Sequence, residues 1–199
     1  GISFDARKFE YIGAPLKDYV ACAVPRAKGV TTMEEWMASK APLKIGGTGR
    51  GGTIDNAIRV FKVALGLPVQ LVSGYKGTSD VRLAIDSGEL DAGCWEWGGM
   101  KVAWRQKLES GDVVVILQAA PTAYPDLPNV PVARNLAKSD SSRRLLQAGV
   151  EVPGTVIRSF VLPPGTPKER VQMLRKAFQD TMSDPEFLAE AKKSKLDVD

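Results

Sequence analysis

The segment Gly46–Thr53, with the sequence GGTGRGGT, contains the residue types that point most directly to chemistry. Glycine occupies five of its positions, and glycine lets a backbone adopt positive φ and approach a bound group without an intervening Cβ. A strand is predicted before this glycine loop and a helix after it. The first turn of a helix offers unpaired N–H groups and the positive end of the helix dipole. The glycine loop therefore predicts a site that binds a small anion through backbone amides.

Side chains in and near the glycine loop extend this prediction. The hydroxyl groups of Thr48 and Thr53 are further donors, and Arg50 offers a charge-assisted hydrogen bond. Lys76 follows the next predicted strand, and open α/β sheets bind their ligands at the carboxyl ends of strands. Lys76 is equally compatible with a solvated surface lysine. Trp95 and Trp97 alternate along a later strand end, so we expect only one of them to face a cleft.

Two other interpretations of the glycine loop stay open. The first is a tight strand–helix turn that needs glycine for its geometry alone. The second is a dinucleotide site, because Gly47, Gly49 and Gly52 match the G-x-G-x-x-G pattern. A dinucleotide fold places an acid at the end of the second strand to bind the ribose. Here that strand leads into Ser73-Gly74-Tyr75-Lys76, which offers no such acid. A lysine there could instead meet the ribose phosphate of NADP, so an NADP-dependent reductase is kept as an alternative.

The composition argues against an enzyme and against a nucleic-acid partner. The chain has 199 residues and no histidine, which removes the commonest general base and most zinc sites. We therefore expect no catalytic residue, no metal and no cofactor. The 27 basic and 23 acidic residues are spread along the chain, whereas nucleic-acid binders cluster their basic residues. Cys22 and Cys94 are interpreted first as two buried thiols and second, for an exported protein, as a disulfide.

The predicted elements place the glycine loop in an α/β fold. Strands and helices alternate four times between about residues 42 and 118, which is typical of a doubly wound, mostly parallel sheet. Thr53 is expected to cap the helix after the glycine loop, and Gly66 to end it. Later in the chain, Asp140 is expected to cap a short helix that Gly149 ends, and Thr166 to cap another helix.

Five segments, in order along the chain, carry a resemblance to a known family. They are Phe4–Phe9, Leu43–Gly46 with the glycine loop, Tyr75–Gly77 with Ala84–Asp91, Tyr124–Pro131, and Leu162–Pro167. Together they resemble the periplasmic substrate-binding proteins of tripartite tricarboxylate transporters, the TctC or Bug family. The resemblance implies a periplasmic-binding-protein type II fold, with two α/β lobes joined by hinge strands. It also implies that this chain corresponds to about the C-terminal two thirds of a member.

The resemblance implies a domain division and a function. Residues 26–157 would be a complete second ligand-binding lobe, and residues 1–25 and 158–199 would be parts of the first lobe with the C-terminal helices. Members capture a small carboxylate in an interlobe cleft in the periplasm and deliver it to membrane components of the transporter. The carried-over ligand-binding residues are Thr48, Gly49, Gly51, Gly52, Thr53, Lys76, Gly77 and Trp97. An effector domain of a transcription regulator shares this architecture and is a further alternative.

Overall fold

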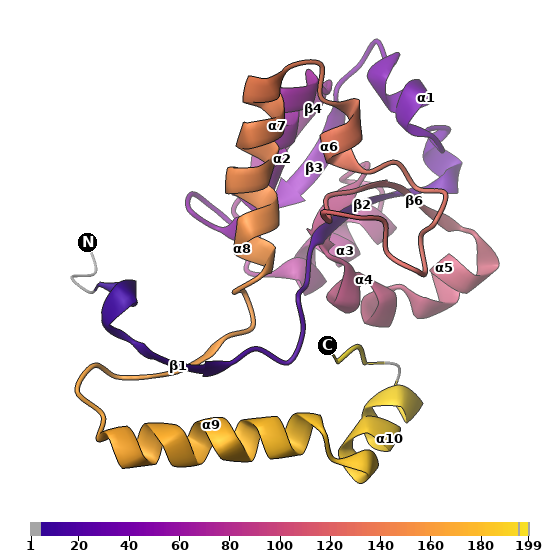
Figure 1. Cartoon of the computed structure of the whole chain (residues 1–199). Helices are drawn as coiled ribbons and strands as arrows, with labels where there is room; N and C mark the ends of the chain where they lie inside the picture. Colours follow the sequence, from indigo (N-terminus) through magenta and orange to yellow (C-terminus); the bar gives the residue numbers. More distant parts are fainter. Residues whose placement is uncertain (1–4, 195, 199) are drawn as a thin grey trace. The chain divides into compact units, whose positions relative to one another are not determined.

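A computed structural model describes residues 5–194 and 196–198 of the chain, which form two compact units (Figure 1). The larger unit is Asp18–Gly154. The smaller unit contains the chain up to Lys17 and from Thr155 onward. Phe4, at the start of the first segment of the family resemblance, lies outside the described residues.

A mixed sheet forms the centre of the larger unit. Its strands are β2 (Val20–Pro25), β3 (Leu43–Gly47), β4 (Val69–Ser73), β5 (Gly93–Glu96) and β6 (Val113–Gln118). β3 and β4 pair in parallel, and an isolated parallel bridge between Ile45 and Ala92 links β3 to the residues before β5. β2 lies between β5 and β6 and runs antiparallel to both. The predicted α/β class is confirmed, with β2 as the antiparallel exception.

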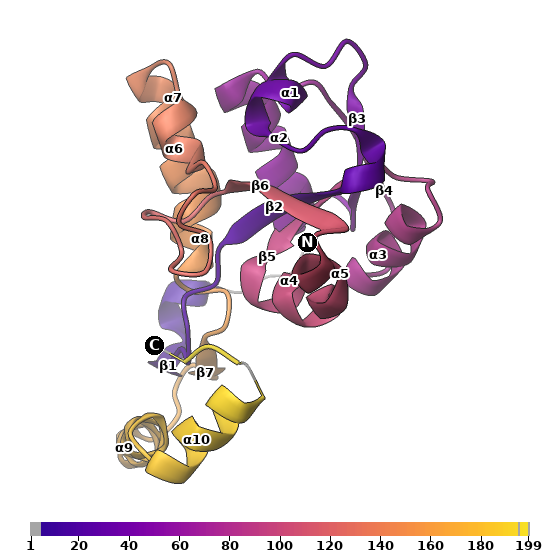
Figure 2. The same cartoon turned by 90° about the vertical axis from the view of Figure 1, so that its right-hand side faces the viewer.

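Helices connect these strands along the chain (Figure 2). They are η2 (Arg26–Lys28), α1 (Met33–Met37), α2 (Thr53–Leu65), α3 (Thr78–Asp86), α4 (Trp97–Ala103), α5 (Arg105–Ser110), α6 (Ala133–Leu136), α7 (Asp140–Leu146), the π-helix η3 (Gln147–Glu151) and α8 (Val152–Gly154). Thr32 and Glu35 form a capping box at the start of α1. None of the helices in the described ranges is long and apolar enough to cross a bilayer.

The ends of α2 agree only in part with the sequence prediction. Gly66 ends the helix in the left-handed conformation with φ 70°, as expected. Thr53 does not cap it, because Gly52 occupies the N-cap position and no side chain accepts a hydrogen bond there. The apolar face of α2 is buried, with Ile58 and Phe61 each 1% exposed. Burial of that face fixes the helix that begins at the glycine loop.

The predicted helix end at Gly149 is wrong. The backbone stays helical from α7 through η3 to Gly154, and the helix is capped by Ser139 rather than by Asp140. A Cβ at Gly149 would lie 2.8 Å from Cγ2 of Val60. Gly149 therefore permits the close packing of this helix on α2 rather than a stop.

Cys22 and Cys94 form a disulfide, so the first interpretation of two free thiols is wrong. The two residues lie opposite each other in the antiparallel pairing of β2 and β5. Both are 0% exposed. The bond closes a loop with a sequence separation of 72, and it joins the first strand of the larger unit to a strand far along the chain.

The edges of the larger unit differ from the predicted boundaries at residues 26 and 157. β2 precedes residue 26 in the sequence, yet it occupies the middle of the three-stranded part of the sheet. The amide of Asp18 donates to the carbonyl of Gly154 over 3.1 Å, so the first and last residues of this unit meet. That the larger unit is a ligand-binding lobe stays a prediction.

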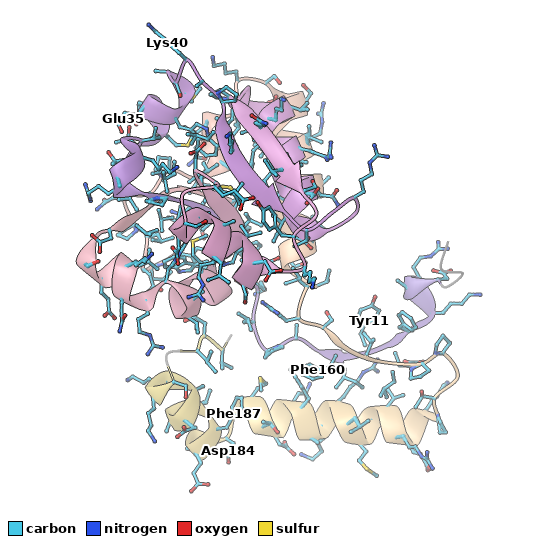
Figure 3. The ribbon with its side chains drawn as sticks, turned by 180° about the vertical axis from the view of Figure 1, so that it is seen from behind. Tyr11, Glu35, Lys40, Phe160, Asp184 and Phe187 are labelled. Atoms are coloured by element: carbon cyan, nitrogen blue, oxygen red, sulfur yellow. A yellow bond between two sulfur atoms is a disulfide. The ribbon has the colours of Figure 1, made fainter. Side chains whose placement is uncertain are left out.

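The smaller unit contains η1 (Ala6–Lys8), β1 (Glu10–Gly13), β7 (Phe160–Leu162), α9 (Lys168–Met182) and α10 (Pro185–Lys193). β1 and β7 form an antiparallel pair that includes Tyr11 and Phe160, and Phe178 of α9 lies against Phe160 with ring centroids 5.9 Å apart (Figure 3). Thr166 does not cap α9, because Pro167 is its N-cap and the Thr166 hydroxyl donates to the Pro163 carbonyl.

Candidate functional site

The glycine loop joins the carboxyl end of β3 to the first turn of α2. Gly49 has φ 132° and Gly51 has φ 85°, a backbone region that residues with a Cβ adopt only with strain. Between them the chain turns sharply, since the amide of Gly52 donates to the carbonyl of Gly49 over 3.1 Å. The positive φ predicted from the glycine content is therefore present at two of the five glycines.

The other three glycines are explained by packing. A Cβ at Gly46 would lie 2.6 Å from Cδ1 of Leu90, and one at Gly47 would lie 2.8 Å from Cδ1 of Leu71. A Cβ at Gly52 would lie 2.8 Å from Oγ1 of Thr48 and 3.2 Å from the carbonyl oxygen of Gly49. Gly46 and Gly47 are thus needed by the core, and Gly52 by the close approach of the loop to itself.

Asp55, to which no sequence pattern pointed, holds the glycine loop in place. Its side chain is 0% exposed although it lies in the first turn of α2. Oδ1 accepts a hydrogen bond of 2.9 Å from the amide of Gly49, and Oδ2 accepts one from the hydroxyl of Ser73 at the end of β4. Asp55 therefore ties the loop to the neighbouring strand, and the Gly49 amide already has an acceptor within the protein.

Replacing Asp55 is expected to loosen the loop without unfolding the unit. In Asp55→Ala the Gly49 amide loses its acceptor, which costs roughly 1–2 kcal/mol of unfolding free energy. Asp55→Asn keeps an acceptor for Gly49 and is expected to cost less. Chemical denaturation of both variants measures the two costs, and equal losses would contradict the assigned hydrogen bond.

The segment after β4 is bound to the glycine loop through the backbone. The amides of Gly74 and Tyr75 both donate to the carbonyl of Gly47, over 3.0 and 3.2 Å. Lys76 follows and is exposed, and its side chain forms no ion pair with any residue that the structure describes. Gly77 is the N-cap of α3. The structure thus brings the predicted segments 48–53 and 76–77 to one edge of the sheet.

Unpaired donors gather at this edge. The amides of Arg50 and Gly51 have no acceptor among the residues of the described ranges. α2 and α3 both begin after a glycine N-cap, and neither has a side chain that accepts from its first turn. Thr32, Ser139 and Asp184 cap α1, α7 and α10, whereas α4, α5, α6 and α9 also begin without a side-chain cap. Two helix termini with free N–H groups provide partial positive charge suited to an anion.

Trp97 does not occupy the strand-end position that the sequence indicated. It is the first residue of α4, it is 4% exposed, and Trp95 beside it is 2% exposed. The predicted alternation of the two residues along a strand end is therefore wrong, because the strand ends before Trp97. Nε1 of Trp97 donates to Oδ2 of Asp126 over 3.4 Å. A direct contact of Trp97 with a ligand stays a prediction.

Asp126 fixes the proline-rich loop of residues 120–131 to α4. Lys101 donates to its Oδ2 over 2.8 Å and lies 5.7 Å from the centroid of the Trp97 ring. The hydrogen bond from Lys101 is the main cause that lowers the pKa of Asp126, against desolvation. Because the folded-state pKa is lowered, this carboxylate stabilises the fold above its unfolded pKa, and the contribution is lost as pH falls below about 4.

In the structurally described chain, no three His, Cys, Asp or Glu side chains are grouped so as to hold a metal ion. Tyr75, in the β4–α3 loop of residues 74–77, donates to Oε1 of Glu89 over 2.6 Å, and this bond is the main cause that raises the pKa of Tyr75 to about 12. The described edge of the sheet contains backbone and hydroxyl donors and the cationic residues Arg50 and Lys76. It also contains two acids, Glu89 and Asp80, and Asp80 accepts from the amide of Lys76 over 3.3 Å.

No protein-family model matches the sequence, and no characterised protein matches it in sequence. Solved structures do match it in fold. A TctC solute-binding protein from Polaromonas has a TM-score of 0.69 at 15% identity, covering 100% of this chain and 64% of its own. The periplasmic binding protein BugD has a TM-score of 0.68 at 21% identity, covering 92% and 57%.

A third similar structure is Rpa4515 of R. palustris with adipate, which has a TM-score of 0.67 at 17% identity and covers 97% of this chain and 61% of its own. This chain therefore spans less than two thirds of the length of each of the three proteins. The likeness of fold agrees with the resemblance carried by the five sequence segments. The chain has the fold of the periplasmic solute-binding proteins of the TctC and Bug type.

Proposed function

We propose that this chain is the larger part of a TctC- or Bug-type solute-binding protein that binds a small organic carboxylate at the glycine loop. The observation that carries the proposal is the pair of uncapped helix termini beside the free amides of Arg50 and Gly51. This chain's share of the donors to the carboxylate would come from Thr48, Gly51, Gly52 and Thr53. Lys76 and Gly77 would lie beside them. Gly49 would contribute its backbone conformation rather than its N–H group, because that group already donates to Asp55.

The ligand class rests on chemistry and on one neighbour. Backbone amides at helix termini favour carboxylates and phosphates alike. Rpa4515, which shares the fold, holds adipate, a dicarboxylate. We therefore favour a carboxylate, and we propose that it is not transformed. Delivery of the ligand to the membrane components of a tripartite transporter belongs to the same proposal.

A periplasmic location is part of the proposal, and the disulfide supports it. Disulfides form and persist in oxidising compartments such as the bacterial periplasm and are rare in the cytosol of most organisms. The buried Cys22–Cys94 bond inside the sheet is a structural one rather than an exposed catalytic pair. A cytosolic transcription regulator would not be expected to contain it.

Calorimetry with acetate, adipate and citrate tests the function in the full-length gene product and in this chain alone. We expect the full-length protein to bind at least one of the three carboxylates more tightly than this chain does. Further donors outside these residues would surround the ligand and exclude competing water. Equal affinities in the two proteins would contradict the proposal that this chain holds only part of the site.

NADPH is expected not to bind. The position at the end of β4 that would recognise the ribose is Ser73, whose hydroxyl donates to the buried Asp55. Ser73 has no positive charge for the 2′-phosphate of NADP. The amide of Gly49, the second glycine of the G-x-G-x-x-G pattern, already donates to the buried Asp55 carboxylate, whose negative charge opposes a pyrophosphate. Nucleotide fluorescence and a thermal-shift titration measure the interaction. A saturable response at micromolar NADPH would favour the reductase alternative over the binding protein.

A further inference from the structure

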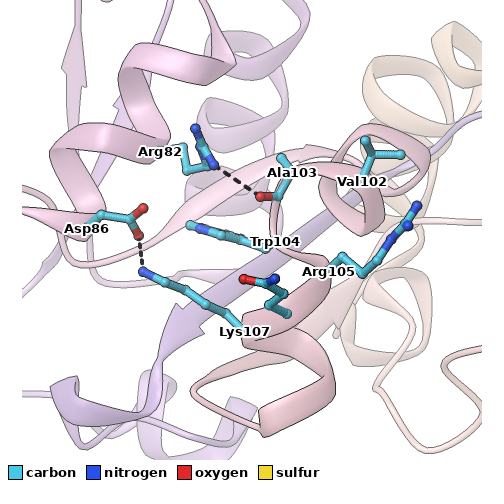
Figure 4. Close-up of a pocket in the computed structure, with 8 residues that line it drawn as sticks. Arg82, Asp86, Val102, Ala103, Trp104, Arg105 and Lys107 are labelled. Carbon is cyan, nitrogen blue, oxygen red and sulfur yellow. Dashed lines mark hydrogen bonds and ion pairs between the residues drawn. The ribbon is translucent and has the colours of Figure 1, made fainter.

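A pocket of about 430 Å³ lies in the larger unit between α3 and the passage from α4 to α5 (Figure 4). Its volume falls in the range of small-ligand sites. Arg82 and Asp86 of α3 line one side, and Arg105 and Lys107 of α5 line the other. None of its lining residues belongs to the glycine loop or to the β4–α3 loop. The pocket is therefore separate from the carboxylate site proposed above.

The charges around the pocket do not balance. Lys107 is paired with Asp86, with Nζ 2.7 Å from Oδ1. Arg82 uses one guanidinium donor on the carbonyl of Ala103, over 3.2 Å, and Arg105 forms no ion pair with a residue in the described ranges. Asp86 is the only acid in the lining. Asp86 is taken by Lys107, so neither guanidinium group in the lining is paired with a carboxylate. A guanidinium group is suited to bidentate binding of a carboxylate.

A buried donor without an acceptor lies in the same place. Trp104 is 2% exposed, and its indole Nε1 has no hydrogen-bond partner among the described residues. The indole nitrogens of Trp36 and Trp97 do have acceptors, the carbonyl of Pro68 and the carboxylate of Asp126. Buried polar groups without a partner are rare and call for an explanation. Figure 4 shows the Trp104 indole lying between Arg82 and Lys107.

We propose that this pocket is a second binding site, which takes a small organic carboxylate. Arg82 binds the carboxylate, the Trp104 N–H donates to it, and Arg105 on the far side of the pocket adds positive charge. Val102 and Ala103 give the pocket an apolar wall, which favours a carboxylate with a short hydrocarbon body over an inorganic anion. The Asp86–Lys107 pair is partly exposed, with side chains 27% and 44% exposed. Such a pair exchanges partners at little cost as the ligand enters.

Butyrate is the probe, and butyramide is its uncharged control. The indole N–H signals of ¹⁵N-labelled protein are followed by NMR, and the Trp104 signal is identified by its loss in Trp104→Phe. We expect butyrate to shift the Trp104 signal to saturation in the millimolar range, and butyramide to leave it in place. Absence of a saturable shift would overturn the proposal.

Variants separate this pocket from the glycine loop. Arg105→Gln is expected to weaken butyrate binding at least fivefold, whereas Arg59→Gln, on the exposed side of α2, is expected to leave it unchanged. Loss of butyrate binding in Gly52→Val with retention in Arg105→Gln would place the only carboxylate site at the glycine loop and overturn the second site. Should Trp104→Phe fail to fold, calorimetry of Arg105→Gln, an exposed position, gives the same decision.

Discussion

Removing the Cys22–Cys94 disulfide is expected to lower the free energy of unfolding by about 2–4 kcal/mol. The bond closes a loop with a sequence separation of 72, and the chain-entropy account assigns about 4 kcal/mol to a loop of this length. Both sulfur atoms are buried between β2 and β5, so the pair of strands stays packed after the bond is broken. The expected result is a weakened fold rather than a lost one.

Denaturant unfolding of the protein with and without reductant measures this effect, and the melting temperature should fall by on the order of 10 °C. The double variant Cys22→Ala/Cys94→Ala is the control, because reductant should not change its stability further. A thiol titration of the denatured, unreduced protein counts free thiols independently. Two titratable thiols would show that the bond is not formed and would restore the interpretation of two buried cysteines.

The second large effect is expected at Gly52, where a side chain would disturb the amide cradle. Gly52→Val adds a Cβ 2.8 Å from Oγ1 of Thr48 and 3.2 Å from the carbonyl oxygen of Gly49. Thr48 can turn its side chain away, but the Gly49 carbonyl can move only with the loop backbone. We expect the full-length protein to lose carboxylate affinity by about ten- to a hundredfold, or roughly 1.4–2.8 kcal/mol.

Two matched variants make the Gly52 result specific. Gly99→Val places a side chain on α4 with 3.8 Å to the nearest atom, a carbon of Trp95, and should leave the affinity unchanged. Lys76→Ala should lose less than Gly52→Val, since an exposed ion pair contributes about 0–1 kcal/mol. Calorimetry measures all three after circular dichroism has shown that they are folded. If Lys76→Ala abolished binding and Gly52→Val did not, the lysine rather than the backbone would hold the anion.

Features set by short stretches of sequence were predictable. The alternation of strands and helices, the position of the glycine loop and the end of α2 at Gly66 depend on residues close together in the chain. The features that were missed depend on distant residues. The acidic side chain of Asp55 was identifiable only as a polar residue on an otherwise apolar face, and its partner Ser73 lies on another strand.

The prediction of two free cysteines and the predicted position of Trp97 were wrong for the same physical reason. The pairing of Cys22 with Cys94 depends on the register of β2 against β5, which the sequence does not specify locally. Trp97 was assigned by strand alternation, but its amide donates to the carbonyl of Tyr19 over 2.9 Å and the chain turns into α4 there. In both cases β2, which lies out of sequence order in the sheet, decides the local structure.

The meeting of Asp18 and Gly154 has a consequence for the order of folding. β1 pairs with β7, so two segments separated by the whole larger unit must find each other. In an unfolded chain, closing a loop of that length costs on the order of 4 kcal/mol. Once the larger unit has folded, the hydrogen bond between Asp18 and Gly154 holds its first and last residues together. Most of the chain entropy that loop closure costs has then already been lost. The β1–β7 pair should therefore form late, as a dependent step that the larger unit makes possible.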